Sequence, residues 1–112
     1  MAFEDVIEAT PSYWKPEKIG DDIEGNVYEI IEGNYGKQIV LDMGDDENGE
    51  IATTTLPSHR QLQNFIPKLK VGDYIRVELV KILPAKVEGR NDTMIYKVQK
   101  DPERFEEYND VI

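Results

Sequence analysis

Eight aromatic and basic side chains could together hold a chain of stacked bases and phosphates. Aromatic rings stack on a base of any sequence, and lysine and arginine follow the phosphates of a single strand. The residues of this kind that fall in predicted strands and loops are Tyr28, Tyr35, Lys37, Tyr74, Arg76, Lys86, Arg90 and Lys97. Their interleaving predicts a surface that binds single-stranded nucleic acid largely without regard to sequence.

Each of these residues also has a structural interpretation. Tyrosine is favoured in strands for packing alone. Tyr96 shares one face of its predicted strand with Met94 and Val98, which places it in the core, whereas Tyr74 and Arg76 share the face opposite Ile75 and Val77. Lys86 and Arg90 fall in a predicted flexible loop, where a role in folding is least expected.

The last twelve residues, 101–112, form an acidic segment with an apolar end. Pro102 interrupts the preceding strand pattern. The candidate partner-binding residues in this tail are Phe105, Glu106, Glu107, Tyr108, Asp110, Val111 and Ile112. Such a segment can dock on basic, apolar pockets of other proteins, or it can lie in the chain's own binding groove as a stand-in for nucleic-acid charge. The simpler alternative is a disordered terminus.

The net charge of −10 is unevenly distributed. Residues 1–59 hold 3 basic and 14 acidic side chains, residues 60–100 hold 9 and 4, and residues 101–112 hold 1 and 5. A globally acidic protein is repelled by nucleic acid, but a locally basic face can still bind it. The basic stretch after residue 59 is therefore the expected binding side.

Several other chemistries are excluded or unsupported. The chain has no cysteine and one histidine, His59, so it offers no disulfide, cysteine–zinc site or thiol nucleophile. The acidic run Asp42–Glu50 lacks the ligand spacing of a calcium loop. No glycine-rich phosphate loop is present. We expect a protein that is not an enzyme and that uses no cofactor and no metal.

Targeting signals are also missing from the sequence. The first ten residues lack the basic start and apolar run of a secretory signal. No stretch approaches the roughly 20 apolar residues of a spanning helix. The expected location is the cytoplasm, or the host cytoplasm if the protein is viral.

The elements that must position these residues follow from hydrophobic periodicity and turn chemistry. The predicted order is a glycine-containing strand from Lys18, strands at 37–43 and 50–56, a helix capped by Ser58 and Gln61, and strands at 74–82 and 93–100. Pro67 should end the helix after two or three turns.

Five short antiparallel strands can close on themselves and leave no edge. We therefore expect an all-β, five-stranded OB-type barrel over residues 18–100, with one short helix between strands 3 and 4. Residues 1–17 form an irregular N-terminal segment and 101–112 a detached acidic tail. A five-stranded SH3-like barrel is the alternative fold.

This order, with Lys70–Val77, Tyr96–Val98 and Glu106–Ile112, resembles the phage-type OB-fold single-stranded DNA-binding proteins. Bacterial relatives end in an aromatic residue, whereas this chain ends in Val111-Ile112. The resemblance implies that a monomer or dimer coats single-stranded DNA, or RNA, during replication, recombination or repair. The tail would recruit replication or recombination proteins, and no membrane would be involved.

Two other functions remain open on the residues alone. The acidic first half could mimic nucleic acid and bind a basic groove on a host protein, which would make the chain an interaction module or inhibitor. An OB-type scaffold subunit of a larger assembly is the third possibility.

Overall fold

The computed structural model describes residues 12–86, 88–90 and 92–108 of the chain. Within these residues the fold is mostly β, with one short α-helix and two 3₁₀ turns. The strands are β1 (Ser12–Tyr13), β2 (Asp22–Gly33), β3 (Gly36–Asp45), β4 (Ile51–Thr55), β5 (Tyr74–Leu83) and β6 (Thr93–Asp101). The helical elements are α1 (Arg60–Gln63), η1 (Ile66–Lys68) and η2 (Pro102–Arg104). No helix in this part of the chain is long and apolar enough to cross a membrane.

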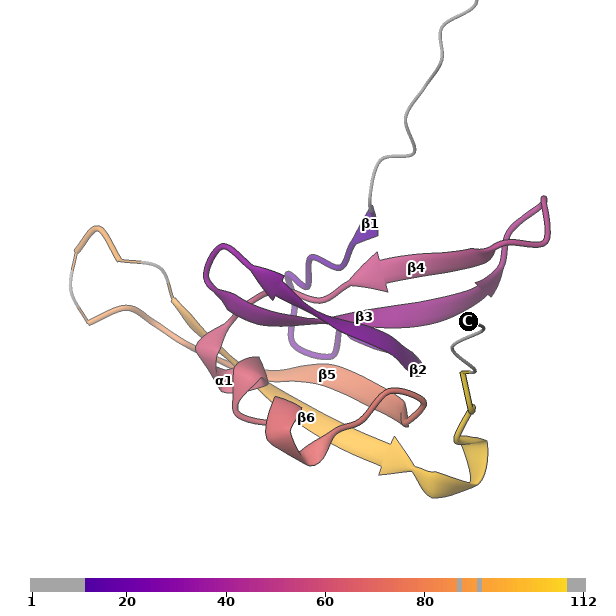
Figure 1. The fold of residues 1–112 in the computed structure, drawn as a ribbon. Coiled ribbons are helices and arrows are strands. Elements are labelled where there is room, and N and C mark those ends of the chain that lie inside the picture. Colours follow the sequence, from indigo (N-terminus) through magenta and orange to yellow (C-terminus); the bar gives the residue numbers. More distant parts are fainter. Residues whose placement is uncertain (1–11, 87, 91, 109–112) are drawn as a thin grey trace, which may run out of the picture.

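All six strands belong to one sheet, in the order β1-β4-β3-β2-β5-β6 (Figure 1). Neighbouring strands are antiparallel except for the two-residue strand β1, which pairs in parallel with β4. The predicted succession of three strands, a short helix and two strands is confirmed. The predicted N-terminal irregular segment includes β1, while residues 1–11 lie outside the described part.

The prediction of a closed barrel is wrong for the described residues, because β4 and β6 do not pair. The edge of β6 is met by α1 instead. The side chain of Gln61 accepts a hydrogen bond from the backbone N–H of Tyr96 (2.9 Å) and donates one to its carbonyl (3.3 Å). A side-chain amide therefore satisfies the backbone groups that strand closure would otherwise use.

Strand β2 joins the two halves of the sheet because it bends midway. Its first part, Asp22–Asn26, pairs with β5, and its second part pairs with β3. The register shifts between Val27 and Glu29, which is the signature of a β-bulge. Gly25 allows the close approach of β3, since a Cβ there would lie 2.6 Å from the carbonyl oxygen of Asp42. This glycine of the first predicted strand thus has a packing reason.

The core forms where the inward faces of the strands meet the helical segment. Its buried members are Val27, Ile39, Leu41, Leu56, Leu62, Ile66, Ile75, Val77, Leu79 and Tyr96. The predicted burial of Tyr96 is confirmed, with 3% of the residue exposed. Trp14 packs on it at 5.9 Å between ring centroids, as expected of a residue that covers the core.

The helix differs from its predicted form. It has a single turn that begins at Arg60, with His59 in the capping position and no side-chain capping bond. The expected capping box of Ser58 and Gln61 is absent because the Gln61 amide is bonded to β6. Pro67 lies within the separate 3₁₀ turn η1.

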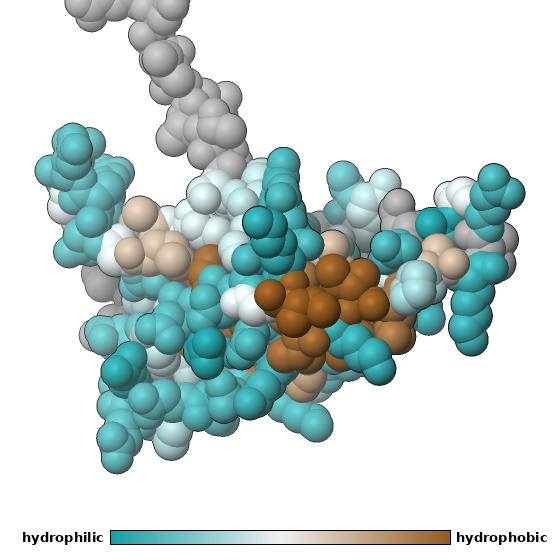
Figure 2. Space-filling model, turned by 180° about the vertical axis from the view of Figure 1, so that it is seen from behind, coloured by the Kyte–Doolittle hydropathy of each residue, from teal (hydrophilic) through white to brown (hydrophobic). Residues whose placement is uncertain are grey.

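The face seen from behind carries an apolar patch within a largely hydrophilic surface (Figure 2). Two exposed apolar side chains, Ile19 and Val80, belong to segments that run side by side. The N–H of Gly20 donates to the carbonyl of Leu79 (2.8 Å), and the N–H of Leu79 donates to the carbonyl of Asp21 (2.9 Å).

Candidate nucleic-acid interface

The eight predicted binding residues fall in two groups. Tyr28, Tyr74, Arg76 and Lys97 lie on the outer face of the sheet, which is the face away from the core, because strand side chains alternate between the two faces. The second group, Tyr35, Lys37, Lys86 and Arg90, lies in or beside two loops at one end of the molecule (Figure 1). From the sequence, all eight residues were expected to form one binding surface.

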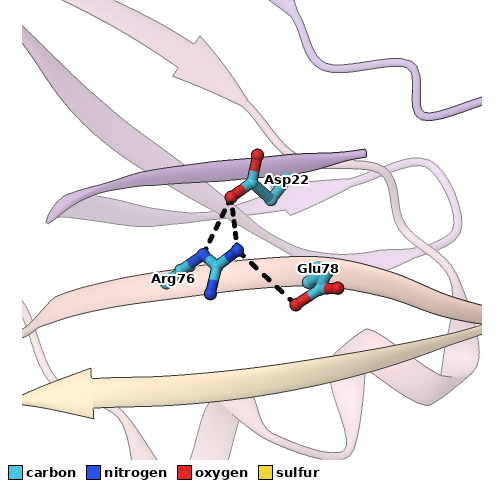
Figure 3. A network of polar contacts seen from close by, with 3 residues as sticks. All are labelled: Asp22, Arg76 and Glu78. Atoms are coloured by element: carbon cyan, nitrogen blue, oxygen red, sulfur yellow. Dashed lines mark hydrogen bonds and ion pairs between the residues drawn. The ribbon is translucent and has the colours of Figure 1, made fainter. Parts of the chain in front are cut away.

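Arg76, one of the two predicted cations on the outer face, is already paired. Arg76 contacts Asp22 at 2.8 Å and Glu78 at 3.6 Å (Figure 3). The hydrogen bond to Asp22, together with its negative charge, raises the pKa of Arg76 above its ordinary value. Lys97 stands opposite Glu78 in the register of β5 and β6, but it is exposed and has no carboxylate within 4.0 Å among the described residues. Of the two predicted cations on this face, Arg76 is therefore neutralised and Lys97 is still able to bind a phosphate.

The aromatic residues of the outer face are covered by the tail. Tyr108 meets Tyr28 edge to face, with 5.2 Å between ring centroids and 87° between planes. The guanidinium of Arg104 lies 4.9 Å from the ring of Tyr74. Both tyrosines are half-buried as a result.

Three hydrogen bonds anchor the tail to the sheet. The Asn26 side-chain amide donates to the carbonyl of Arg104 (2.8 Å), and the N–H of Glu106 donates to the carbonyl of Gly72 (2.9 Å). The hydroxyl of Tyr108 donates to the carboxylate of Asp42 (2.6 Å). Burial, the bond to Asp42 and its charge raise the pKa of Tyr108, so this hydroxyl stays protonated.

The path of the tail also depends on Gly72. A Cβ at this position would collide with the carbonyl oxygen of Glu106 and lie 2.7 Å from the ring of Phe105. Phe105 is 42% exposed and has the ammonium of Lys70 4.8 Å from its centroid. As far as Tyr108 the tail is thus docked on the sheet, not detached. Asp110, Val111 and Ile112 lie outside the described residues.

Together with Arg60 of α1, the second group makes up what we call the basic end: Tyr35, Lys37, Arg60, Lys86 and Arg90. All five are exposed, Tyr35 to 84%. Among the described residues, no carboxylate lies within 4.0 Å of these four cations. These cations therefore have no close ion pair within this part of the chain, although two acidic residues belong to the same end: Glu32 stands opposite Lys37 in the register of β2 and β3, and Glu88 lies between Lys86 and Arg90 in the loop.

Helix α1 connects the two loops of the basic end. On one side, the Gln63 amide donates to the carbonyl of Tyr35 (3.0 Å) and so holds the turn between β2 and β3. On the other side, residues 59–61 line a hollow together with residues 92–94, which follow the loop between β5 and β6. The one-turn helix therefore fixes the turn that carries Tyr35 relative to the start of β6.

A larger hollow of about 470 Å³ lies between the β2–β3 hairpin and the helical segment. Its lining residues are Ile30, Lys37, Gln63, Ile66, Pro67 and Leu69. Four of these residues are apolar, and Lys37 and Gln63 add an ammonium and an amide, so that polar and apolar surface line the hollow in similar amounts.

Sequence reasoning did not single out Arg60, Gln61 and Gln63 because it assigned them to an ordinary capped helix. It also missed the residues that receive the tail, Asn26 and Asp42. The available signal was weak: two glutamines and an arginine in a very short helix exceed what packing requires.

No protein-family model matches this chain, and neither the characterised proteins nor the solved structures that were searched contain a match. In the described part, no three His, Asp or Glu side chains are grouped as metal ligands would be.

Proposed function

We propose that this chain is a non-catalytic, largely sequence-independent single-stranded DNA-binding protein that acts in replication, recombination or repair. The observation that carries the proposal is the basic end, where the β2–β3 turn, α1 and the β5–β6 loop hold four exposed cations and an exposed tyrosine, and no described carboxylate lies within 4.0 Å of these cations. Cations bind phosphates and release their counterions, and an exposed ring stacks on a base.

The distribution of charge supports this end as the contact surface. Arg76 on the outer face is neutralised by Asp22 and Glu78, so phosphates gain little from this cation. The acidic remainder of the molecule repels a polyanion and would orient it towards the basic end.

The strand order supports an OB-type fold that is open instead of closed. Strands β4-β3-β2-β5-β6, with α1 between β4 and β5, have the connectivity of the five-stranded OB barrel, which is often only partly closed. In that fold, nucleic acid meets the loop between the first two strands and the loop between the last two. Here these are the β2–β3 turn with Tyr35 and the loop with Lys86 and Arg90.

The tail supports a regulatory part of the proposal. It covers Tyr28 and Tyr74 and carries the exposed carboxylates Glu103, Glu106 and Glu107 across the outer face. A strand that extends from the basic end onto these tyrosines must displace it. Displacement would then free Phe105 and Tyr108 for a partner protein.

The test is fluorescence anisotropy of labelled oligo-dT with the full chain at several salt concentrations. Binding should weaken steeply as salt rises, because phosphate contacts release counterions. The double variant Lys37→Glu/Arg90→Glu should lose most of this binding. Lys15→Glu/Lys18→Glu changes the net charge equally at two exposed lysines outside the basic end and should bind nearly as well as the wild type. An equal loss of oligo-dT affinity in both double variants would overturn the basic end as the binding surface. A wild type that does not bind oligo-dT at low salt would overturn the proposed function.

One observation favours a second candidate, an acidic interaction module. Beyond Asp42, strands β3 and β4 continue as an arm that projects from the sheet (Figure 1). The arm carries exposed Met43 and Ile51 beside four exposed carboxylates, Asp45, Asp46, Glu47 and Glu50. A partner with a basic, apolar groove would fit it. This function predicts no oligonucleotide binding and a partner contact that Lys37→Glu/Arg90→Glu leaves intact.

A further inference from the structure

We propose that the hollow beside the β2–β3 turn is a subsite for one unstacked base of a bound single strand. The inference rests on the proposed function and adds a specific contact to it. Ile30 and Lys37 supply one wall from the hairpin, while Gln63, Ile66, Pro67 and Leu69 supply the other from the helical segment. At about 470 Å³ the hollow is in the size range of small-ligand sites.

The chemistry of the lining suits a base better than a chain of charges. Four apolar side chains would contact the faces of a ring. Lys37 is exposed, so its ammonium can bind the adjoining phosphate. Tyr35, two residues earlier and 84% exposed, is placed to stack on the neighbouring base.

Gln63 adds a polar group of defined orientation. Its Nε2 donates to the carbonyls of Tyr35 (3.0 Å) and Ser58 (2.7 Å), which uses both amide hydrogens. Its Oε1 receives no hydrogen bond within the described residues and is left as an acceptor. The N–H groups on the edge of an unstacked base are donors that match it.

The acidic, apolar end of the chain's own tail is the competing occupant. Tyr108 is bonded to Asp42, which lies five residues beyond Lys37 on β3, roughly 16 Å at about 3.3 Å per residue. The four residues that follow Tyr108 span at most about 14 Å. The tail docks on the outer face, whereas Ile30 packs against the core on the other side. Nucleic acid is therefore the better occupant.

The experiment compares Ile30→Phe, which fills the hollow, with Ile31→Phe, its half-buried neighbour outside the lining. Binding to oligo-dT should weaken about tenfold in Ile30→Phe, the share of one stacked base, and stay within about twofold of wild type in Ile31→Phe. Both variants should bind an abasic sugar–phosphate oligomer as the wild type does. Equal oligo-dT affinities in the two variants would overturn the subsite alone, whereas a wild type that binds no oligo-dT would overturn the proposed function.

A second measurement does not depend on the folding of a variant. Oligonucleotides that carry 5-iodouracil should photocrosslink to wild-type protein within residues 63–69 or at Lys37. Crosslinks found elsewhere and absent from these residues would overturn the subsite. A synthetic peptide of residues 101–112 provides the remaining check: if Ile30→Phe abolishes binding of this peptide and spares oligo-dT, the hollow belongs to the tail of another copy and the proposal fails.

Discussion

Replacing Tyr108 by Phe should release the tail and strengthen nucleic-acid binding. The change removes one hydrogen bond, from the Tyr108 hydroxyl to the Asp42 carboxylate (2.6 Å), and keeps the ring that contacts Tyr28. It leaves the net charge of the protein unaltered near neutral pH, since the pKa of Tyr108 is raised. Any gain in affinity would therefore come from undocking and not from altered charge.

The expected gain in oligo-dT affinity follows from the strength of the hydrogen bond between Tyr108 and Asp42. Hydrogen bonds to charged groups contribute about 1.5–3 kcal/mol, and the half-exposed setting of this pair favours the lower end. A loss of about 1.4 kcal/mol lowers the ratio of docked to undocked tail about tenfold. If the tail competes with the strand, oligo-dT should then bind up to about tenfold more tightly at low salt.

The assay is oligo-dT anisotropy on wild type, Tyr108→Phe and Tyr13→Phe. Tyr13 is an exposed tyrosine of β1, so its variant controls for loss of a hydroxyl and should match wild type. Hydrogen exchange at the N–H of Glu106, which is bonded to Gly72, reports undocking directly. Faster exchange at Glu106 with unchanged oligo-dT affinity would refute competition between tail and strand.

Three further predictions concern stability. Gly25→Ala should cost about 1–3 kcal/mol in urea unfolding, because the new Cβ would lie 2.6 Å from the carbonyl oxygen of Asp42; an unchanged midpoint would contradict the close packing. Gln61→Ala removes both bonds to the backbone of Tyr96 and should cost about 1–3 kcal/mol, whereas Gln99→Ala on an exposed site should cost little; equal costs would show that the Gln61 bonds are not stabilising. Burial raises the pKa of Tyr96 from 10.0 to about 12, which favours the neutral form in the folded state. The raised pKa should therefore add about 2–3 kcal/mol to the free energy of unfolding below pH 10, and this amount should be lost as pH rises to 12. Urea titrations should show the loss in the wild type and not in Tyr96→Phe.

The order of elements was predictable because strand alternation and turn chemistry are local properties. The strands predicted at 37–43 and 50–56 and the alternation in the strand predicted at 74–82 appear close to where the sequence places them. Closure of the barrel depends on which groups meet the edge of β6. Gln61 forms hydrogen bonds with this edge, although its sequence context favoured helix capping. Hydrophobic periodicity does not predict such a bond.

The candidate site was predictable only in its residue types. Tyr35, Lys86 and Arg90 lie in two loops, and Lys37 lies at the start of β3 beside the first of them. The pairing of Arg76 with Asp22 joins residues 54 positions apart and follows from the register of β2 and β5. The docking of Tyr108 on Asp42 spans 66 positions and has no local signal. Long-range polar pairs of this kind required the three-dimensional structure.

The most direct test of the central claim is the salt-dependent titration of oligo-dT with wild type, Lys37→Glu/Arg90→Glu and Lys15→Glu/Lys18→Glu. The basic end predicts tight binding at low salt in the wild type and in Lys15→Glu/Lys18→Glu, with a steep salt slope, and near-complete loss in Lys37→Glu/Arg90→Glu. If neither the wild type nor Tyr108→Phe, whose tail is freed, binds oligo-dT at low salt, the claim that this chain binds single-stranded DNA is contradicted.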